Sequence, residues 1–346
     1  MNLFLDRLQS LPEGGENLVF TLLEGEEAGE KAIFSEGELL LCSGEESFFS
    51  SFRGEALGST ENGIIIMGGK RVFAERLGGE PKVVICGAGH VSIPIIRLSK
   101  MLGLKVTCID DREEFAYNAR ETEADTVICE DFSTALKNLK SDAYTYYIIV
   151  TRSHEWDIDC LRAISEKSFA YVGMMGSARR VAVVKEKLLE EGLPERFILS
   201  LHAPIGLPIG AETPDEIAVS ILSEIIEVKN RTGKTYGYPG EFLKTLSALQ
   251  SDGSDDKSCV LATIVSKKGS APRRIGTKML ILPKRKMVGS IGGGRAEAIV
   301  LEKARELLKN KDGKPVLLDI DLSGEDAANQ GMVCGGVLEV FLEPLF

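Results

Sequence analysis

Short apolar runs alternate with amphipathic stretches of helical period between residues 81 and 231. Residues 82–86 are apolar and β-branched and stop at a glycine, which is typical of a buried strand. A helical pattern at 91–102 ends at Gly103, and residues 106–109 predict a second strand. Further strands are expected at 125–129, 143–150 and 169–172, with helices at 133–139, 158–166, 181–191 and 214–230. This alternation predicts a parallel sheet with helices on both faces.

The turn after the first of these strands is rich in glycine. Gly87 and Gly89 would let the backbone approach a phosphate, which the start of the next helix would bind through its free N–H groups. Asp110 ends the second strand about 20 residues later, where such folds bind a ribose hydroxyl. Ser92 replaces the third glycine of the usual fingerprint. We therefore predict a Rossmann-type α/β domain and leave nucleotide binding open, because fold does not fix function.

The rest of the chain has a different pattern. Residues 1–80 are β-rich, and residues 236–257 have the glycine, proline and serine content of a linker. Residues 258–346 predict a smaller α+β domain of strands around one helix at 295–308. The expected domains are thus a β-rich segment at 1–80, the Rossmann-like domain at 81–235, the linker, and the C-terminal domain.

The chain contains three histidines, and each follows a predicted strand or buried run. His90, His154 and His202 would therefore all lie in loops at the edge where open parallel sheets bind ligands. Three roles remain open for them: structural hydrogen bonding, contact with a substrate or phosphate, and a metal site together with Asp157. Their spacing does not match a local metal motif.

Two further segments are candidates for anion binding. Gly176-Ser177, together with Arg179 and Arg180, stands at the start of a predicted helix and forms either an anion site or a capped, solvated end. The triple glycine 292–294 precedes another helix and could bind an anion through its backbone. Cys334 lies beside two glycines, which leaves two roles open: a buried, inert thiol, or a thiolate that binds a metal or sulfur centre.

Composition narrows the classes of partner. The net charge of −11 argues against nucleic acid and against an anionic membrane surface. No apolar run has the 18 or more residues of a membrane span, and the N-terminus does not have the pattern of a signal peptide. We therefore expect a cytoplasmic protein. The seven cysteines include no CxxC pair, so most are expected to be small buried residues.

Residues 62–75 can be aligned with 330–343 with small gaps. Gly68-Gly69 then meets Gly335-Gly336, and the stretch 72–75 meets 340–343. Upstream, residues 21–23 are similar to 263–265. We interpret the first copy as a degenerate repeat that kept its strands, lost the triple glycine and its helix, and packs with the C-terminal segment.

The motifs together resemble a known family, the xanthine dehydrogenase accessory factors (XdhC/CoxI proteins). The similar segments are GAGHVS (87–92), CIDDREEFA (108–116), TRSHEWD (151–157), YVGMMGSARR (171–180), HAPIGLPIGAETPDEIAVSILSEI (202–225), GSAPRRIGTKMLI (269–281), GSIGGG (289–294) and GMVCGG (331–336). The family usually has a cysteine after GSxGGG, and this chain has Arg295 there. The family also usually places its GSAP domain before the Rossmann domain, whereas here the intact copy comes last.

The resemblance implies an accessory factor that binds molybdenum cofactor (molybdopterin), protects it during sulfuration and delivers it to a molybdenum hydroxylase apo-enzyme. A cysteine desulfurase is the other implied partner, and we expect a homodimer. The residues fit a holder better than a catalyst, since glycine loops and arginines would bind the pterin phosphate and Cys334 would approach the metal. The residues assigned to cofactor binding are Gly87, Gly89, His90, Asp110, His154, Ser177, Arg179, His202, Ser270, Arg273, Gly292, Gly293, Gly294, Arg295 and Cys334.

Two other functions remain open. An NAD(P)-dependent oxidoreductase would bind NAD or NADP at Gly87 and Asp110 and use a proton donor such as His154. We find no clear Lys/Tyr or His/Asp catalytic arrangement in the sequence for it. A non-enzymatic nucleotide-sensing module would bind nucleotide but no pterin.

Overall fold

The computed structural model describes residues 2–11, 17–43, 47–51, 62–231, 237–238, 240–251, 258–269, 273–283, 286–310, 313–322 and 336–345. The chain forms two compact units. The first combines Met1–Gly78 with Gly233–Phe346, and the second is Gly79–Thr232. No helix within the described ranges is long and apolar enough to cross a membrane.

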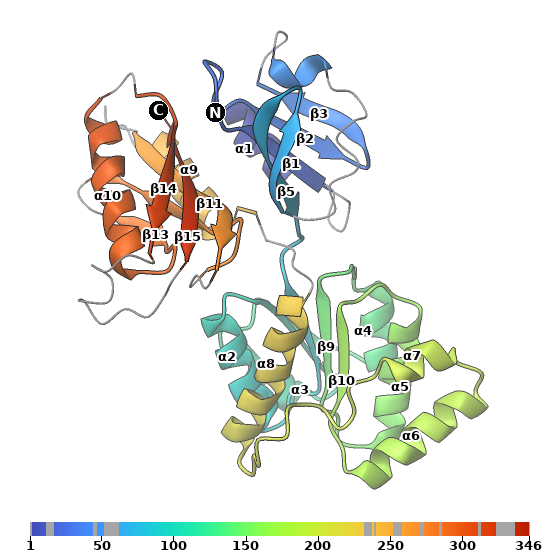
Figure 1. Ribbon diagram of the computed structural model, residues 1–346. Coiled ribbons are helices and arrows are strands. Elements are labelled where there is room, and N and C mark those ends of the chain that lie inside the picture. Colours follow the sequence, from blue (N-terminus) through green and yellow to red (C-terminus); the bar gives the residue numbers. More distant parts are fainter. Residues whose placement is uncertain are drawn as a thin grey trace. The chain divides into compact units, whose positions relative to one another are not determined.

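The second unit contains a five-stranded parallel sheet, here called the central sheet (Figure 1). Its strands are β6 (Lys82–Cys86), β7 (Lys105–Asp110), β8 (Thr126–Cys129), β9 (Thr145–Ile149) and β10 (Tyr171–Met174). They lie in the order β10-β9-β6-β7-β8, and every neighbouring pair is parallel. The direction of the strand order reverses between β6 and β9, which is where open α/β sheets bind ligands. The predicted Rossmann-type domain is confirmed.

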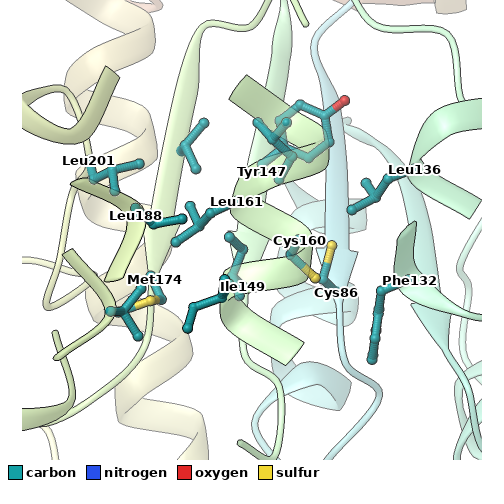
Figure 2. Packing of buried hydrophobic residues seen from close by; sticks show 14 of the residues in the cluster. Cys86, Phe132, Leu136, Tyr147, Ile149, Cys160, Leu161, Met174, Leu188 and Leu201 are labelled. Atoms are coloured by element: carbon teal, nitrogen blue, oxygen red, sulfur yellow. The ribbon is translucent and has the colours of Figure 1, made fainter. Parts of the chain in front are cut away.

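Helices cover both faces of the central sheet because its strands are apolar on both sides. They are α2 (Ser92–Met101), α3 (Glu113–Arg120), α4 (Phe132–Asn138), α5 (His154–Ser165), α6 (Ala178–Glu190), α7 (Glu195–Leu199) and α8 (Pro214–Arg231). One face packs against α4 to α7, and Figure 2 shows this core with Cys86 and Cys160 side by side. The other face packs against α2, α3 and α8.

The first unit contains two antiparallel sheets, here called the N-terminal sheet and the C-terminal sheet. The N-terminal part consists of α1 (Asn2–Gln9), β1 (Asn17–Leu22), β2 (Lys31–Ser35), β3 (Glu38–Cys42), the short 3-10 helix η1 (Phe48–Ser51), β4 (Gly63–Met67) and β5 (Lys70–Leu77). Its strand order is β3-β2-β1-β5-β4. Phe20, Phe34 and Phe49 fill the core on one side of this sheet.

The C-terminal part consists of α9 (Gly240–Ser251), β11 (Cys259–Lys268), β12 (Lys278–Ile281), β13 (Met287–Gly289), α10 (Gly294–Lys309), β14 (Val316–Asp321) and β15 (Val337–Leu345). The strand order is β13-β12-β11-β15-β14. Helix α10 covers one face, where Val300 and Ala304 are buried against the strands. This antiparallel sheet with one long helix agrees with the predicted α+β domain.

The structure differs from the sequence prediction at residues 236–257, which were expected to form a linker. Helix α9 occupies most of this segment, and its Phe242 and Leu246 are buried against Leu261 and Leu280. Residues four apart share one face of a helix, so this pair marks an amphipathic helix. The glycines, proline and serines on either side obscured that pattern.

Candidate functional site at the carboxyl edge of the central sheet

The two glycines after β6 have different environments. Gly87 has a φ of +109°, and a Cβ there would lie 2.6 Å from the Val150 carbonyl oxygen, so only glycine fits. A Cβ on Gly89 would meet nothing within 4 Å. Gly87 is therefore needed for packing against the end of β9. The backbone at Gly89 faces open space that a ligand can enter.

Asp110, at the end of β7, anchors the glycine turn. Its carboxylate is fully buried and accepts hydrogen bonds from the Ala88 N–H (2.7 Å) and the Arg112 N–H (3.0 Å). The Arg112 guanidinium binds both carboxylate oxygens, at 2.9 and 3.0 Å. This differs from the expected contact with a ribose hydroxyl. Arg112 folds back from two residues further along the chain and occupies both oxygens, so a ribose would have to displace it.

Arg152 joins the loops on either side of the glycine turn. It forms a bidentate pair with Asp111, with N–O distances of 2.5 and 2.7 Å, and stacks over the Trp156 ring at 4.9 Å. Asp111 follows β7 and Arg152 follows β9, and β6 lies between those two strands. The hydrogen bond from Arg152 lowers the pKa of Asp111 despite some desolvation. The pair thus links the loop after β7 to the loop after β9, across the point where the strand order reverses.

A buried carboxylate fixes the start of α5 to the start of α6. Asp157 accepts hydrogen bonds from the Thr151 hydroxyl (2.6 Å) and from Arg180 Nε (2.7 Å). Burial raises the pKa of Asp157, against the lowering effect of Thr151 and Arg180. Arg180 was expected, with Arg179, to bind an anion, but it pairs with Asp157 instead. Ser177 caps α6 by accepting the Arg180 N–H (3.3 Å), and the exposed Arg179 remains available to an anion at this helix start.

The three histidines do not form one cluster. His90 and His154 are exposed, and the part of the chain that the structure describes holds no group of His, Cys, Asp and Glu suited to a metal. His202 lies beside β10, where its N–H donates to the Val172 carbonyl (3.0 Å) and its carbonyl accepts from the Met174 N–H (3.0 Å). The three histidines therefore share the predicted edge but give no support to the metal alternative.

His202 belongs to a hydrogen-bonded set. Its Nδ1 lies 2.8 Å from Glu224 Oε1, and the Tyr171 hydroxyl donates to Glu224 Oε2 at 2.6 Å. The Gly206 N–H donates to the same oxygen at 2.8 Å. Burial alone would raise the pKa of Glu224, but the hydrogen bonds from Tyr171, Gly206 and His202 lower it overall. Glu224 therefore holds the imidazole in place through Nδ1.

Sequence reasoning missed both Tyr171 and Glu224. Glu224 stands in α8 next to the buried Leu222 and Ile225. A carboxylate beside the apolar face of a helix is expected to have a partner, and that signal was present in the sequence. Tyr171 gave no such signal, because a tyrosine in a buried strand is ordinary.

The triple glycine of the C-terminal domain differs from an open anion site. Gly292, Gly293 and Gly294 all have positive φ, at 124°, 74° and 63°. Glu297 Oε2 accepts the Gly293 N–H (3.1 Å) and the Ser290 hydroxyl (2.7 Å). The carboxylate of the domain itself thus takes the position predicted for an anion. Arg295 is half-buried at the start of α10 and Arg273 is exposed, whereas Ser270 and Cys334 lie outside the described residues.

The predicted site residues fall into two groups in different units. The central sheet carries Gly87, Gly89, His90, Asp110, His154, Ser177, Arg179 and His202, and the C-terminal domain carries Arg273, Gly292, Gly293, Gly294 and Arg295. The first group surrounds the carboxyl ends of β6, β7, β9 and β10. These features define a Rossmann-type domain combined with an antiparallel glycine-loop domain.

Comparison with known families identifies the class more closely. Residues 83–225 match the model of the XdhC Rossmann domain, and residues 254–321 match the model of the XdhC and CoxI family. The chain belongs to the XdhC/CoxI family, as its motifs predicted.

Individual relatives agree with this assignment. The chain is 35% identical over 164 residues to the uncharacterized protein YqeB of Escherichia coli K12, covering 47% of this chain and 30% of that protein. It is 28% identical over 160 residues to a probable xanthine dehydrogenase subunit of Bacillus subtilis 168, covering 46% of each. The chain thus spans less than half the length of these curated relatives. A crystal structure described as a xanthine dehydrogenase from Bacillus halodurans shares the fold, with a TM-score of 0.50, 21% identity, and coverage of 66% of this chain and 64% of that one.

Proposed function

We propose that this protein is an accessory factor that binds molybdenum cofactor and delivers it to a xanthine dehydrogenase-type molybdenum hydroxylase. Membership of the XdhC/CoxI family carries the proposal, supported by the name of the Bacillus subtilis relative. The apo-enzyme would be the receiving partner, and a cysteine desulfurase would act on the bound cofactor. The cofactor would supply the redox-active metal, and this chain would supply binding and protection.

The carboxyl edge of the central sheet offers groups that suit the anionic part of such a cofactor. The backbone at Gly89 is open, and Ser177 and Arg179 stand at the start of α6, where N–H groups and the helix dipole favour a phosphate. Arg179 is exposed, so its guanidinium is accessible to a phosphate there. Asp110 fits a ribose poorly, because Arg112 already occupies both of its oxygens.

The test is the pterin and molybdenum content of protein purified anaerobically from a cofactor-producing host. Gly89→Val fills the open space at the turn, and Gly63→Val is its control because a Cβ at either glycine meets nothing within 4 Å. We expect near-stoichiometric pterin in the wild type and in Gly63→Val, and little in Gly89→Val. Cys334→Ala shows whether the C-terminal domain also contacts the cofactor. If the wild type carries no pterin and fails to bind purified cofactor, the proposal is wrong.

A second candidate function is an NAD(P)-dependent oxidoreductase, favoured by the pairing of His202 with Glu224 at the ligand-binding edge. A carboxylate that fixes one imidazole nitrogen leaves the other free to exchange a proton. Titration with NADH and NADPH, followed by a search for turnover, separates this function from the first. Cofactor oxidation that is lost in His202→Gln would favour it.

A further inference from the structure

The N-terminal and C-terminal sheets have the same strand order. In each, the strands taken in chain order lie as third, second, first, fifth, fourth. Each sheet also follows a helix, with Phe4 and Leu8 in α1 and Phe242 and Leu246 in α9 at the same spacing. Leu11, just after α1, and Leu249, in α9, continue that spacing. The common order therefore includes a helix as well as five strands.

The pairing register repeats as well. Thr21 lies opposite Lys31 on one side and Phe73 on the other. Thr263 lies opposite Lys278 and Phe341 in the same way. The register makes the following residues equivalent: Lys31 and Lys278, Phe73 and Phe341, Glu75 and Glu343, Leu23 and Val265, and Arg71 and Glu339.

Equivalent residues meet reciprocally where the two sheets pack. Lys31 pairs with Glu343 at 2.8 Å, and Lys278 pairs with Glu75 at 2.5 Å, so the lysine of each sheet binds the glutamate of the other. All four side chains are at most one-tenth exposed. Reciprocal contacts of this kind are the signature of a two-fold axis.

Arg71 lies close to this approximate axis, because it contacts its own equivalent. Its guanidinium binds Glu339 at 2.5 Å. The hydrogen bond that Arg71 donates to Glu339 raises the pKa of Arg71. Burial alone would raise the pKa of Glu339, but hydrogen bonds from Arg71 and Ser266 and the charges of Arg71 and Lys268 lower it overall. Phe73 and Phe341 lie in one apolar cluster with Leu23 and Val265. The Arg71–Glu339 pair and this apolar cluster thus bring together residues that occupy the same position in the two sheets.

We propose that the two sheets are copies of one domain joined as an intramolecular pseudo-dimer, and that the Arg71–Glu339 pair selects this arrangement. The C-terminal domain alone carries both Lys278 and Glu343, so its surface is complementary to a second copy of itself at those positions. At the axis, however, two C-terminal copies would place Glu339 against Glu339. Two N-terminal copies would place Arg71 against Arg71. Only the mixed pair brings opposite charges together, and like charges at such a contact exclude the alternatives.

The pseudo-dimer gives the N-terminal domain a role. Among its described residues, the N-terminal domain has no counterpart of α10. Between β3 and β4 it has the short helix η1 instead, with the buried Phe49. It therefore serves as the partner of the C-terminal domain and occupies a surface that would otherwise bind a second chain. This role does not depend on the cofactor proposed above.

The test uses the folded full-length chain with protease sites inserted between Gly78 and Gly79 and within 232–236. After cleavage, we expect fragments 1–78 and 233–346 to remain together in a 1:1 ratio by native mass spectrometry. Arg71→Glu and Glu339→Arg should each weaken this association by about ten-fold or more, because each places like charges at the axis. The double variant Arg71→Glu/Glu339→Arg should restore it. Lys303→Glu, on the exposed face of α10, is the control and should change nothing.

Mixing provides a second measurement that does not require cleavage. In the full-length Arg71→Glu chain both axis positions carry glutamate, and in the Glu339→Arg chain both carry arginine. Opposite charges can therefore meet only between one chain of each variant. We expect the mixture of the two to have twice the mass of either variant alone in light scattering. Single variants that keep the wild-type 1:1 affinity, or a mixture that gains no mass, would overturn the proposal.

Discussion

The buried ion pair between Lys278 and Glu75 allows a quantitative test of the structure of the first unit. The two side chains are 3% and 2% exposed, and the ammonium lies 2.5 and 2.6 Å from the two carboxylate oxygens. Burial lowers the pKa of Lys278, against the raising effect of Glu75. Glu75→Gln removes that compensation and leaves an ammonium group without its main counter-charge.

The expected loss follows from the burial. Removal of one partner of a buried pair costs about 3–5 kcal/mol. The protein can instead fold with Lys278 in its neutral form. Deprotonating a lysine with the ordinary pKa of 10.5 at pH 7 costs about 1.4 kcal/mol per pH unit, so the loss of stability cannot exceed about 5 kcal/mol. A lysine pKa that is lower in the folded state means that folding releases a proton, so stability rises with pH up to 10.5. The deficit of Glu75→Gln should therefore shrink by up to about 1.4 kcal/mol for each pH unit above 7.

Urea denaturation can assign this loss to the correct unit. Trp156 is the only tryptophan and lies in the second unit, so its fluorescence reports the unfolding of that unit. Circular dichroism reports the unfolding of both units. We expect the transition seen by circular dichroism alone to shift, and the Trp156 transition to stay in place. Glu306→Gln, from the exposed pair with Lys303, should cost less than about 1 kcal/mol. A loss of that size in Glu75→Gln, or one independent of pH, would refute the buried pairing.

Three further predictions concern the second unit, which contains the central sheet, and can be followed by Trp156 fluorescence during urea denaturation. Arg180→Met leaves the buried Asp157 carboxylate without its cation and should lower the free energy of unfolding by about 3 kcal/mol at pH 7. This loss should become smaller once the pH falls below the raised folded pKa of Asp157, because the neutral acid needs no cation. Glu224→Gln should flatten the fall in stability below pH 4.5, because the lowered pKa of Glu224 makes its contribution one that is lost on acidification. Gly173→Ala should cost about 1–3 kcal/mol, since a Cβ there overlaps the Tyr171 hydroxyl and Ile205, whereas Gly89→Ala should cost less than about 0.5 kcal/mol.

The sequence carried enough information to predict the central domain, because its strands are continuous apolar runs and its helices have a clear period. The same rules missed α9, where Phe242 and Leu246 lie in a segment bounded by residues typical of loops. The site was less predictable for a physical reason. The contact of Arg112 with Asp110 and that of Glu297 with Gly293 depend on which way a charged side chain folds back, and periodicity carries no information on that.

The groups that surround the two predicted glycine sites indicate where an anionic ligand would bind. At the C-terminal glycine loop, an incoming phosphate must displace or repel the Glu297 carboxylate, which already accepts the Gly293 N–H and the Ser290 hydroxyl. At the central sheet the Asp110 carboxylate likewise accepts an N–H of the glycine turn, that of Ala88, but its charge is paired with Arg112. Gly89 faces open space there, and Arg179 is exposed at the start of α6. The Glu297 carboxylate would also repel a phosphate at the C-terminal loop, whereas the exposed Arg179 would attract one. The phosphate-bearing end of a ligand is therefore expected at the central sheet, which is why Gly89 is the decisive position for testing cofactor binding.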